Sequence, residues 1–159
     1  MINIRSFVAA DAEPIARLFH ETVREINIRD YSPSQVQAWA PDDLNFRDWV
    51  QRNETRWIYV ADDRGAIAGF CELEPSGHID CFYCHKNYQG RGVGRQLYQA
   101  LETQAMNQSI HCLFVEASIT AKPFFQKMGF RLLREQTVTV RGHQFINYAM
   151  DKAIIELSS

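Results

Sequence analysis

Three glycines within five positions constrain the fold of this chain more than any other feature. Gly90, Gly92 and Gly94 follow an apolar segment with the pattern of a strand, and a helical pattern begins after them. Glycine is unfavourable in a regular element unless the backbone must approach another group closely. A helix start presents unpaired N–H groups and the positive end of the helix dipole, which together bind anions. The surrounding residues 81–101 contain no Asp or Glu but three basic side chains: Lys86, Arg91 and Arg95. We therefore predict a phosphate-binding site at this strand–helix junction.

Length and composition predict an ordinary globular domain. The chain has 159 residues, of which 46% are hydrophobic and 23% charged, and we expect one domain over residues 1–159. Lys plus Arg is 17 and Asp plus Glu is 19, so the net charge is −2. Proteins that grip nucleic acid through its phosphates normally have a basic excess, so no nucleic-acid partner is expected.

The sequence also lacks membrane and export signals. No apolar run approaches the roughly 20 residues that span a bilayer, and residues 1–13 have no apolar core of a secretory signal. We therefore expect a cytoplasmic protein with no membrane partner, whose four cysteines stay reduced.

Apolar periodicity predicts elements in the order β-α-α-β-β-β-α-β-α-β-β. The predicted strands are Ile2–Phe7, Trp57–Ala61, Ala66–Leu73, His78–Cys84, Ile110–Ala117, Phe130–Val140 and Gln144–Met150. Three predicted helices begin at the caps Asp11, Ser32 and Thr120. Another passes through Phe46, Trp49 and Val50, and another follows Gly94. The fourth strand, the helix after Gly94 and the fifth strand form a βαβ unit, so those two strands should be parallel neighbours.

The glycine segment does not match the common nucleotide loops. A Walker loop requires Gly-Lys-Ser/Thr, but Arg95 and Gln96 follow Gly94. The dinucleotide pattern G-x-G-x-x-G also fails, because its last position falls on Arg95 or Leu97. The pattern that fits is Gln-x-x-Gly-x-Gly, in the segment Gln89-Gly90-Arg91-Gly92-Val93-Gly94-Arg95.

That segment resembles the pyrophosphate loop of the GNAT (GCN5-related N-acetyltransferase) superfamily. A second segment resembles the superfamily signature A-x-x-F-Y-x-x-x-G-F: Ala121-Lys122-Pro123-Phe124-Phe125-Gln126-Lys127-Met128-Gly129-Phe130. A closer resemblance, to the YafP-like bacterial branch, rests on further residues: Tyr31-Ser32-Pro33, Gln35, Trp39-Ala40, Ile79-Asp80, 117–125 and Arg141-Gly142. The resemblance implies an α/β GNAT fold, with a mixed, mostly antiparallel central sheet flanked by helices and with strands four and five splayed apart.

The resemblance also implies acetyl-CoA as co-substrate. Backbone N–H groups of the loop from Gly90 to Arg95 would hold the pyrophosphate, with Arg91 or Lys86 near the adenosine phosphates. The fourth-strand backbone at Phe82 and Cys84 would pair with the pantetheine like an added strand. Ser118 stands where the family often has Asn, and its hydroxyl still suits a pantetheine carbonyl.

Acetyl transfer needs a neutral amine, so a proton acceptor is useful. Asp80 is the first candidate, because it is an acid inside an apolar strand next to the cofactor segment; Glu72 and Glu116 are weaker candidates. Phe125 replaces the tyrosine that protonates the departing sulfur in many family members. Tyr148, Tyr83 or water are the alternatives for that proton.

We place Tyr31, Trp39 and Asn147 in the acceptor pocket, and we expect a small-molecule amine as acceptor. Three other functions stay open: a CoA-binding sensor, a degenerate site, and acetylation of a protein. The acidic net charge argues against charged tRNA as acceptor. The sequence leaves a homodimer open.

Cys81-Phe82-Tyr83-Cys84-His85 matches the haem attachment pattern C-x-x-C-H. Haem attachment requires export, and side chains three positions apart in a strand point to opposite faces. A zinc site would need a second ligand pair, which the sequence lacks. We therefore expect neither haem nor metal.

Overall fold

The computed structural model describes residues 1–42 and 48–155. Its strands are β1 (Asn3–Ser6), β2 (Trp57–Asp63), β3 (Ala66–Leu73), β4 (Ile79–Cys84), β5 (Cys112–Ser118), β6 (Arg131–Val140) and β7 (His143–Ala153). Its helices are α1 (Ala12–Glu25), α2 (Pro33–Trp39), α3 (Trp49–Arg52), α4 (Val93–Asn107) and α5 (Lys122–Lys127). The element order agrees with the predicted one except that three helices, not two, lie between β1 and β2.

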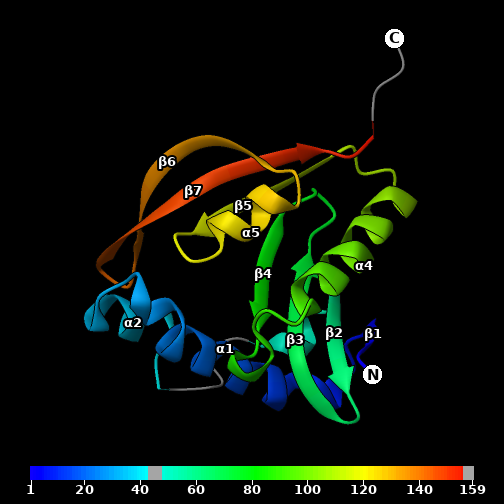
Figure 1. Ribbon diagram of the computed structural model, residues 1–159, viewed down its shortest axis with the longest axis horizontal. Coiled ribbons are helices and arrows are strands. Elements are labelled where there is room, and N and C mark those ends of the chain that lie inside the picture. The colour runs from blue at the N-terminus through cyan, green and yellow to red at the C-terminus, as the bar shows by residue number, and fades with distance from the viewer. Residues whose placement is uncertain (43–47, 156–159) are drawn as a thin grey trace.

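The strands form two antiparallel sheets that diverge from a common edge (Figure 1). One sheet has the order β1-β2-β3-β4 and the other β5-β7-β6. Between β4 and β5 the structure gives one parallel bridge, at His78 and Phe114, where the Phe114 N–H donates to the Gly77 carbonyl oxygen at 3.1 Å. The fourth and fifth strands are therefore parallel and splayed, as the sequence predicts.

Gly77 permits this close approach of the sheets. Its φ is +97°, which side-chain-bearing residues rarely adopt, and a Cβ there would overlap the Cys112 carbonyl oxygen. The turn before β4 can therefore lie directly against the start of β5.

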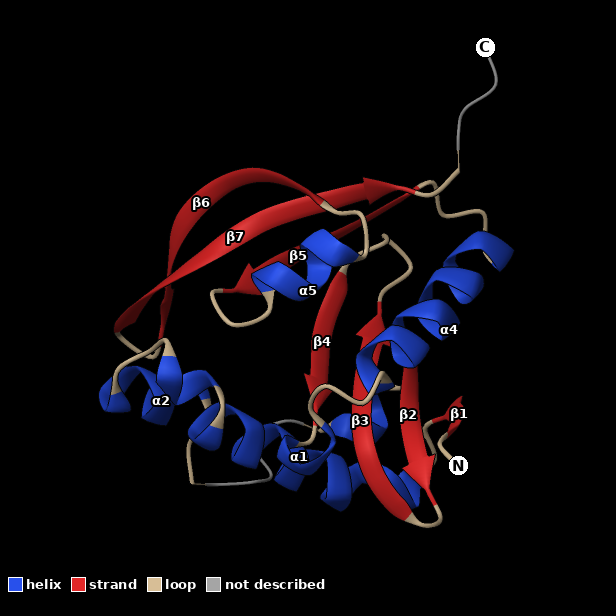
Figure 2. Cartoon of the chain, in the orientation of Figure 1, coloured by secondary structure: helices blue, strands red, loops and turns tan. Residues whose placement is uncertain are grey.

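Helices cover both faces of the four-stranded sheet (Figure 2). Phe70 and Cys81 pack in one cluster with α1, α2 and α3, whereas Cys71 and Leu73 pack in the other cluster with α4. Strand alternation produces this division, because successive side chains of β3 and β4 point to opposite faces.

Of the three predicted helix caps, Ser32 is confirmed, Asp11 is the N-cap residue of α1 but makes no side-chain cap bond, and Thr120 is wrong. The Ser32 side chain accepts a hydrogen bond from the Gln35 N–H at 3.2 Å and begins α2. Asp11 precedes α1, but its carboxylate accepts from the Val8 N–H at 2.8 Å and pairs with Arg5. Thr120 donates to Asp30 at 2.8 Å, and Ala121 is the residue that caps α5. At Asp11 and at Thr120 a charged partner elsewhere in the chain binds the side chain, so neither side chain makes a cap bond.

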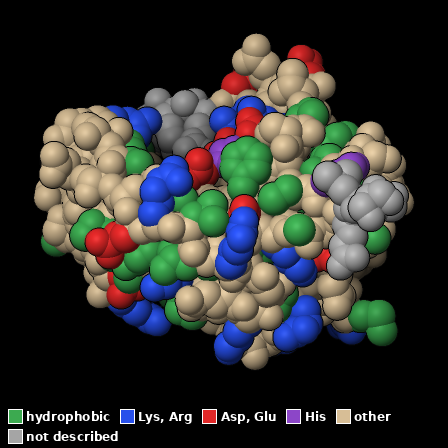
Figure 3. Space-filling view, turned by 90° about the horizontal axis from the view of Figure 1, so that it is seen from above, with side chains coloured by type: hydrophobic (Ala, Val, Ile, Leu, Met, Phe, Trp, Pro, Cys, Tyr) green, Lys and Arg blue, Asp and Glu red, His purple; other side chains and the backbone are tan. Residues whose placement is uncertain are grey.

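The predicted helix through Phe46 lies partly outside the described residues; Trp49 and Val50 belong to α3, which Asp48 caps. β7 extends beyond its predicted end at Met150, since Ala153 still pairs with Cys112 of β5. None of the helices among the described residues is long and apolar enough to cross a bilayer. The face in Figure 3 mixes Lys, Arg, acidic and hydrophobic side chains, so no single charge covers it.

Candidate active site

A cavity of about 570 Å³ lies where the two sheets diverge. Its wall includes β4, the end of β5, the start of α4 and most of α5. The α1–α2 region and the hairpin of β6 and β7 complete it. Of the residues that the sequence favours for the site, all but Arg91 line this cavity: Tyr31, Trp39, Asp80, Phe82, Cys84, Gln89, Gly90, Gly92, Val93, Gly94, Arg95, Ser118, Phe125 and Asn147. Their roles stay predictions, but the fold brings them to one place. The weaker candidates Glu72, Lys86 and Tyr148 do not line it.

The three glycines of the loop are required for different structural reasons. Gly90 and Gly92 have φ values of +74° and +80°, and Gly92 is the residue at which α4 begins. No side chain caps α4, so its first N–H groups lie at the cavity wall without that partner. Gly94 has ordinary φ, but a Cβ there would stand 3.1 Å from the Phe124 ring. Two glycines shape the turn, and the third lets α4 pack against α5.

The basic residues near the loop are placed differently from one another. Arg95 lines the cavity, as does Lys127 of α5, which the sequence analysis did not single out. Arg91 is the predicted site residue outside the cavity wall, and its guanidinium lies over the Tyr88 ring at 4.8 Å. Lys86 is paired with Glu25 at 2.6 Å.

Gln89 connects the loop to the strand before it. Its side-chain amide donates to the Cys84 carbonyl oxygen at 2.7 Å. The first residue of the loop motif thus fixes the loop against the end of β4, where Phe82 and Cys84 line the cavity.

Asp80 belongs to a cluster of acids and arginines. Its carboxylate, at the cavity wall, pairs with Arg52 and, at 2.8 Å, with Arg56. The same arginines bind Glu72, which is 0% exposed, at 2.7 and 3.2 Å. The buried Glu72 carboxylate is therefore compensated, as a buried charge must be.

Glu116 lies at the cavity wall from β5 and is held by His78. The His78 Nε2 is 2.5 Å from Glu116, and its Nδ1 is 2.5 Å from Glu74, which pairs with Arg56 at 3.0 Å. Hydrogen bonds to Glu116 and Glu74 raise the pKa of His78 to about 9, and the bond from His78 lowers the pKa of Glu116. His78 is thus an imidazolium near neutral pH.

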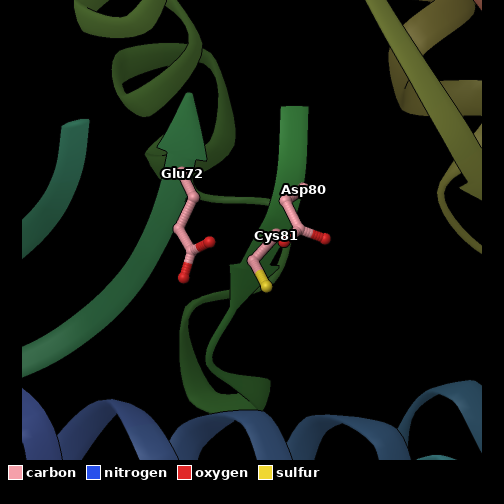
Figure 4. A group of neighbouring side chains, drawn as sticks. All are labelled: Glu72, Asp80 and Cys81. Atoms are coloured by element: carbon pink, nitrogen blue, oxygen red, sulfur yellow. The ribbon is translucent and has the colours of Figure 1, made fainter. Parts of the chain in front are cut away.

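The described side chains bring Glu72, Asp80 and Cys81 close enough to suggest a metal site, with one ligand atom of each within 4.8 Å of the others (Figure 4). The two carboxylates already bind Arg52 and Arg56, and these cations occupy the position that a metal would need. This donor set therefore does not suit a metal ion.

The end of the cavity opposite the loop is aromatic. Tyr31, Trp39 and Phe145 contact one another with ring centroids 5.4 to 6.1 Å apart. The Tyr31 hydroxyl donates to the Ile146 carbonyl oxygen at 2.7 Å and accepts from the Ile119 N–H at 2.9 Å. Tyr31 therefore lines the cavity with its ring, while its hydroxyl makes hydrogen bonds that hold the fold together.

Phe125 is 1% exposed and packs against Phe82, Phe124 and Phe130 with centroids 5.2 to 5.6 Å apart. Of the two tyrosines considered in its place, Tyr83 lines the cavity. Tyr148 is outside the wall, and its hydroxyl donates to Glu135 at 3.2 Å.

Cys81 and Cys84 lie on opposite faces of β4, in the two separate core clusters, as strand alternation predicts. Burial raises the pKa of the Cys84 thiol to about 11, so it stays protonated beside the cavity.

Besides Lys127, sequence reasoning missed the uncharged polar wall residues Thr22 and Asn27. Thr22 recurs with Ile15, Phe19 and Ile26 on the apolar face of α1. A polar residue on a buried helical stripe was the available signal.

Comparisons with known proteins agree with this geometry. Residues 27–152 match the model of the acetyltransferase (GNAT) domain family. The uncharacterized N-acetyltransferase YafP of Escherichia coli K12 is 32% identical over 149 residues, covering 94% of each chain. A GCN5-related N-acetyltransferase from Rhodopseudomonas palustris is 33% identical, with a TM-score of 0.88 and coverage of 95% and 94%. The PaiA N-acetyltransferase of Thermoplasma acidophilum, solved with coenzyme A, shares the fold at 17% identity, with a TM-score of 0.80 and coverage of 96% and 99%. The family-model match and the two relatives above 30% identity show that this chain belongs to the GNAT acetyltransferase family.

Proposed function

We propose that this protein transfers an acetyl group from acetyl-CoA to the amine of a small molecule, with both substrates bound at once. One observation carries the proposal: the glycine loop, the open edge of β4 and an aromatic wall all border one cavity. A donor on the loop and an acceptor on the aromatic wall would meet where the sheets diverge.

The donor would bind through backbone groups. The pyrophosphate would lie on the N–H groups at the start of α4, with Arg95 and Lys127 supplying positive charge. The pantetheine would pair with the β4 backbone at Phe82 and Cys84, on the edge that β5 leaves open. The solved coenzyme A complex of the Thermoplasma relative supports CoA as the ligand of this fold.

In the proposed reaction the amine nitrogen attacks the thioester carbonyl carbon, the C–S bond breaks and CoA leaves as thiolate. The ammonium first loses a proton, for which we propose Asp80. The cluster around Asp80 holds four carboxylates and three cations: Glu72, Glu74, Asp80, Glu116, Arg52, Arg56 and His78. This excess of negative charge favours an ammonium nearby. A thiol has a pKa near 8.5, so CoA can leave as a thiolate without a strong acid to protonate its sulfur. The reaction therefore tolerates Phe125 in place of the usual tyrosine.

Replacing Gly92 with Glu tests the donor site. The side chain and its charge would enter the space of the pyrophosphate, so we expect no measurable CoA binding by calorimetry. Gly142→Glu is a matched control, because Gly142 has φ +78° and, like Gly92, no neighbour within 4 Å of an added Cβ. Unchanged CoA affinity in a folded Gly92→Glu protein would refute the loop as the donor site.

Asp80→Asn tests the proton acceptor. It keeps the shape but removes basicity, so we expect turnover to fall by roughly 10²–10⁴ while CoA affinity is kept. Glu116→Gln is the comparison, because Glu116 is the second carboxylate near the split of the sheets. Full turnover per folded molecule, with only a lower melting temperature, would assign Asp80 to structure alone.

A CoA-binding sensor is the second candidate, favoured by the buried Phe125 in place of the usual tyrosine. Acetyl-CoA consumption with a panel of amines separates the two. A sensor would bind CoA with normal affinity and release no thiol with any amine.

A further inference from the structure

We propose that the acceptor end of the cavity selects an amine whose body is uncharged, partly apolar, and equipped with a neutral hydrogen-bonding group such as an amide. This inference rests on the proposed function and defines the class of its acceptor.

The first support is the charge of the wall. The described wall residues of the α1–α2 region and the β6–β7 hairpin include no charged side chain: Thr22, Ile26, Asn27, Tyr31, Trp39, Val138, Val140, Phe145 and Asn147. The charged wall residues lie elsewhere, with Asp80 and Glu116 at the split and Arg95 and Lys127 beside α4 and α5. An acceptor carboxylate or second ammonium would therefore lose water without gaining a counter-ion.

The second support is a pair of buried polar atoms in this wall. Thr22 is 5% exposed, and its Oγ1 has no hydrogen-bond partner. The Asn147 Oδ1 is likewise buried without a partner. Native proteins rarely leave such atoms unpaired, and each unpaired atom needs an explanation. Because both residues line the cavity, a ligand is the natural partner, and Asn147 Oδ1 requires a donor.

The third support is the shape of the remaining surface. Trp39 and Phe145 lie edge-on to one another with centroids 6.1 Å apart, and both line the cavity. The Tyr31 hydroxyl is already bonded to two backbone groups, so Tyr31 offers its ring. The wall therefore suits a ligand with an apolar body, and Thr22, Asn27 and Asn147 are the wall residues that can make polar contacts with it.

The test is equilibrium binding, measured on the wild-type protein with and without saturating CoA. The probes are two matched sets of amines. One is norleucinamide, norleucine and lysinamide; the other is phenylalaninamide, phenylalanine and its 4-aminomethyl amide. In each set the second probe has a carboxylate in place of the neutral amide, and the third keeps the amide but carries a second ammonium. We expect the neutral amide to bind at least tenfold more tightly than both charged members in at least one set. A preference below tenfold in both sets, or no binding by any amide, would overturn the inference.

Thr22→Val tests the wall directly. Removing an unpartnered buried hydroxyl should leave the melting temperature unchanged or higher, whereas affinity for the better amide should fall about 3- to 30-fold. Thr103→Val is the matched control, since Thr103 is an exposed helical threonine outside the cavity wall. Unchanged amide affinity in Thr22→Val would also count against the inference. CoA affinity of the wild type reports separately on the proposed function: its absence would reject the donor site, whatever the amides do.

Discussion

At the scale of single residues, the Tyr31 hydroxyl joins segments that are far apart in the sequence. It bonds the Ile119 N–H after β5 and the Ile146 carbonyl oxygen in β7, and burial raises its pKa. Tyr31→Phe would leave both backbone groups without that partner, so we expect the free energy of unfolding to fall by about 1–3 kcal/mol. Tyr148→Phe is the control, because its hydroxyl makes one exposed bond, and we expect a change within about 0.5 kcal/mol. Urea denaturation measures both, and equal losses would contradict this role for Tyr31.

At the scale of elements, His78 connects the two sheets at their one described bridge. Its ring bonds Glu74 before β4 and Glu116 in β5, and it stacks on Phe114 with centroids 5.0 Å apart. Its pKa is raised to about 9 by Glu116 and Glu74, above an ordinary value of 6.5. A pKa that is higher in the folded state means that protonated His78 stabilises the fold. This stabilisation is complete below pH 6.5 and is lost as the pH rises through 9.

We therefore expect the free energy of unfolding near pH 6 to be higher in the wild type than in His78→Gln, by at most about 3 kcal/mol. The difference should shrink as the pH approaches 9 and above. The lowered pKa of Glu116 has the opposite dependence, so its contribution fades on acidification below about pH 4.5. Denaturation from pH 5.5 to 9.5 measures the difference, and a constant gap would show that His78 acts by packing alone.

The elements also show what the sequence can predict. Strand and helix periods are local, so the strands, the βαβ unit and the loop at residues 89–95 follow from neighbouring residues, whereas the splayed sheets are implied only by the family resemblance. Side-chain cap bonds are absent at Asp11 and Thr120, because Arg5 and Asp30 bind those side chains. The cluster of Arg52 and Arg56 with Asp80 escapes prediction for the same reason, since these ion pairs join residues 24 to 28 positions apart.

At the scale of the whole molecule, the proposed donor end and the proposed acceptor end of the cavity differ in how the sequence encodes them. The loop from Gln89 to Arg95 is continuous in the sequence, so a motif identifies it. The acceptor wall combines residues 22–39 with residues 138–147, which only the folded chain brings together. This difference explains why the sequence predicts the family and the co-substrate more readily than the acceptor class.

The same geometry predicts how CoA should affect the whole fold. A ligand lying between β4 and β5 would bind the native state alone, so at 100 times its dissociation constant it adds about 2.7 kcal/mol of stability. For a chain of this size that corresponds to roughly 5–11 °C in melting temperature. Gly92→Glu should abolish the shift and Gly142→Glu should keep it. Hydrogen exchange should show added protection at β4 and the start of α4, and little at β1, which lies at the far edge of its sheet. Protection spread evenly over all strands would mean that CoA stabilises the fold without occupying the split, because only a ligand in the split pairs with the open edge of β4.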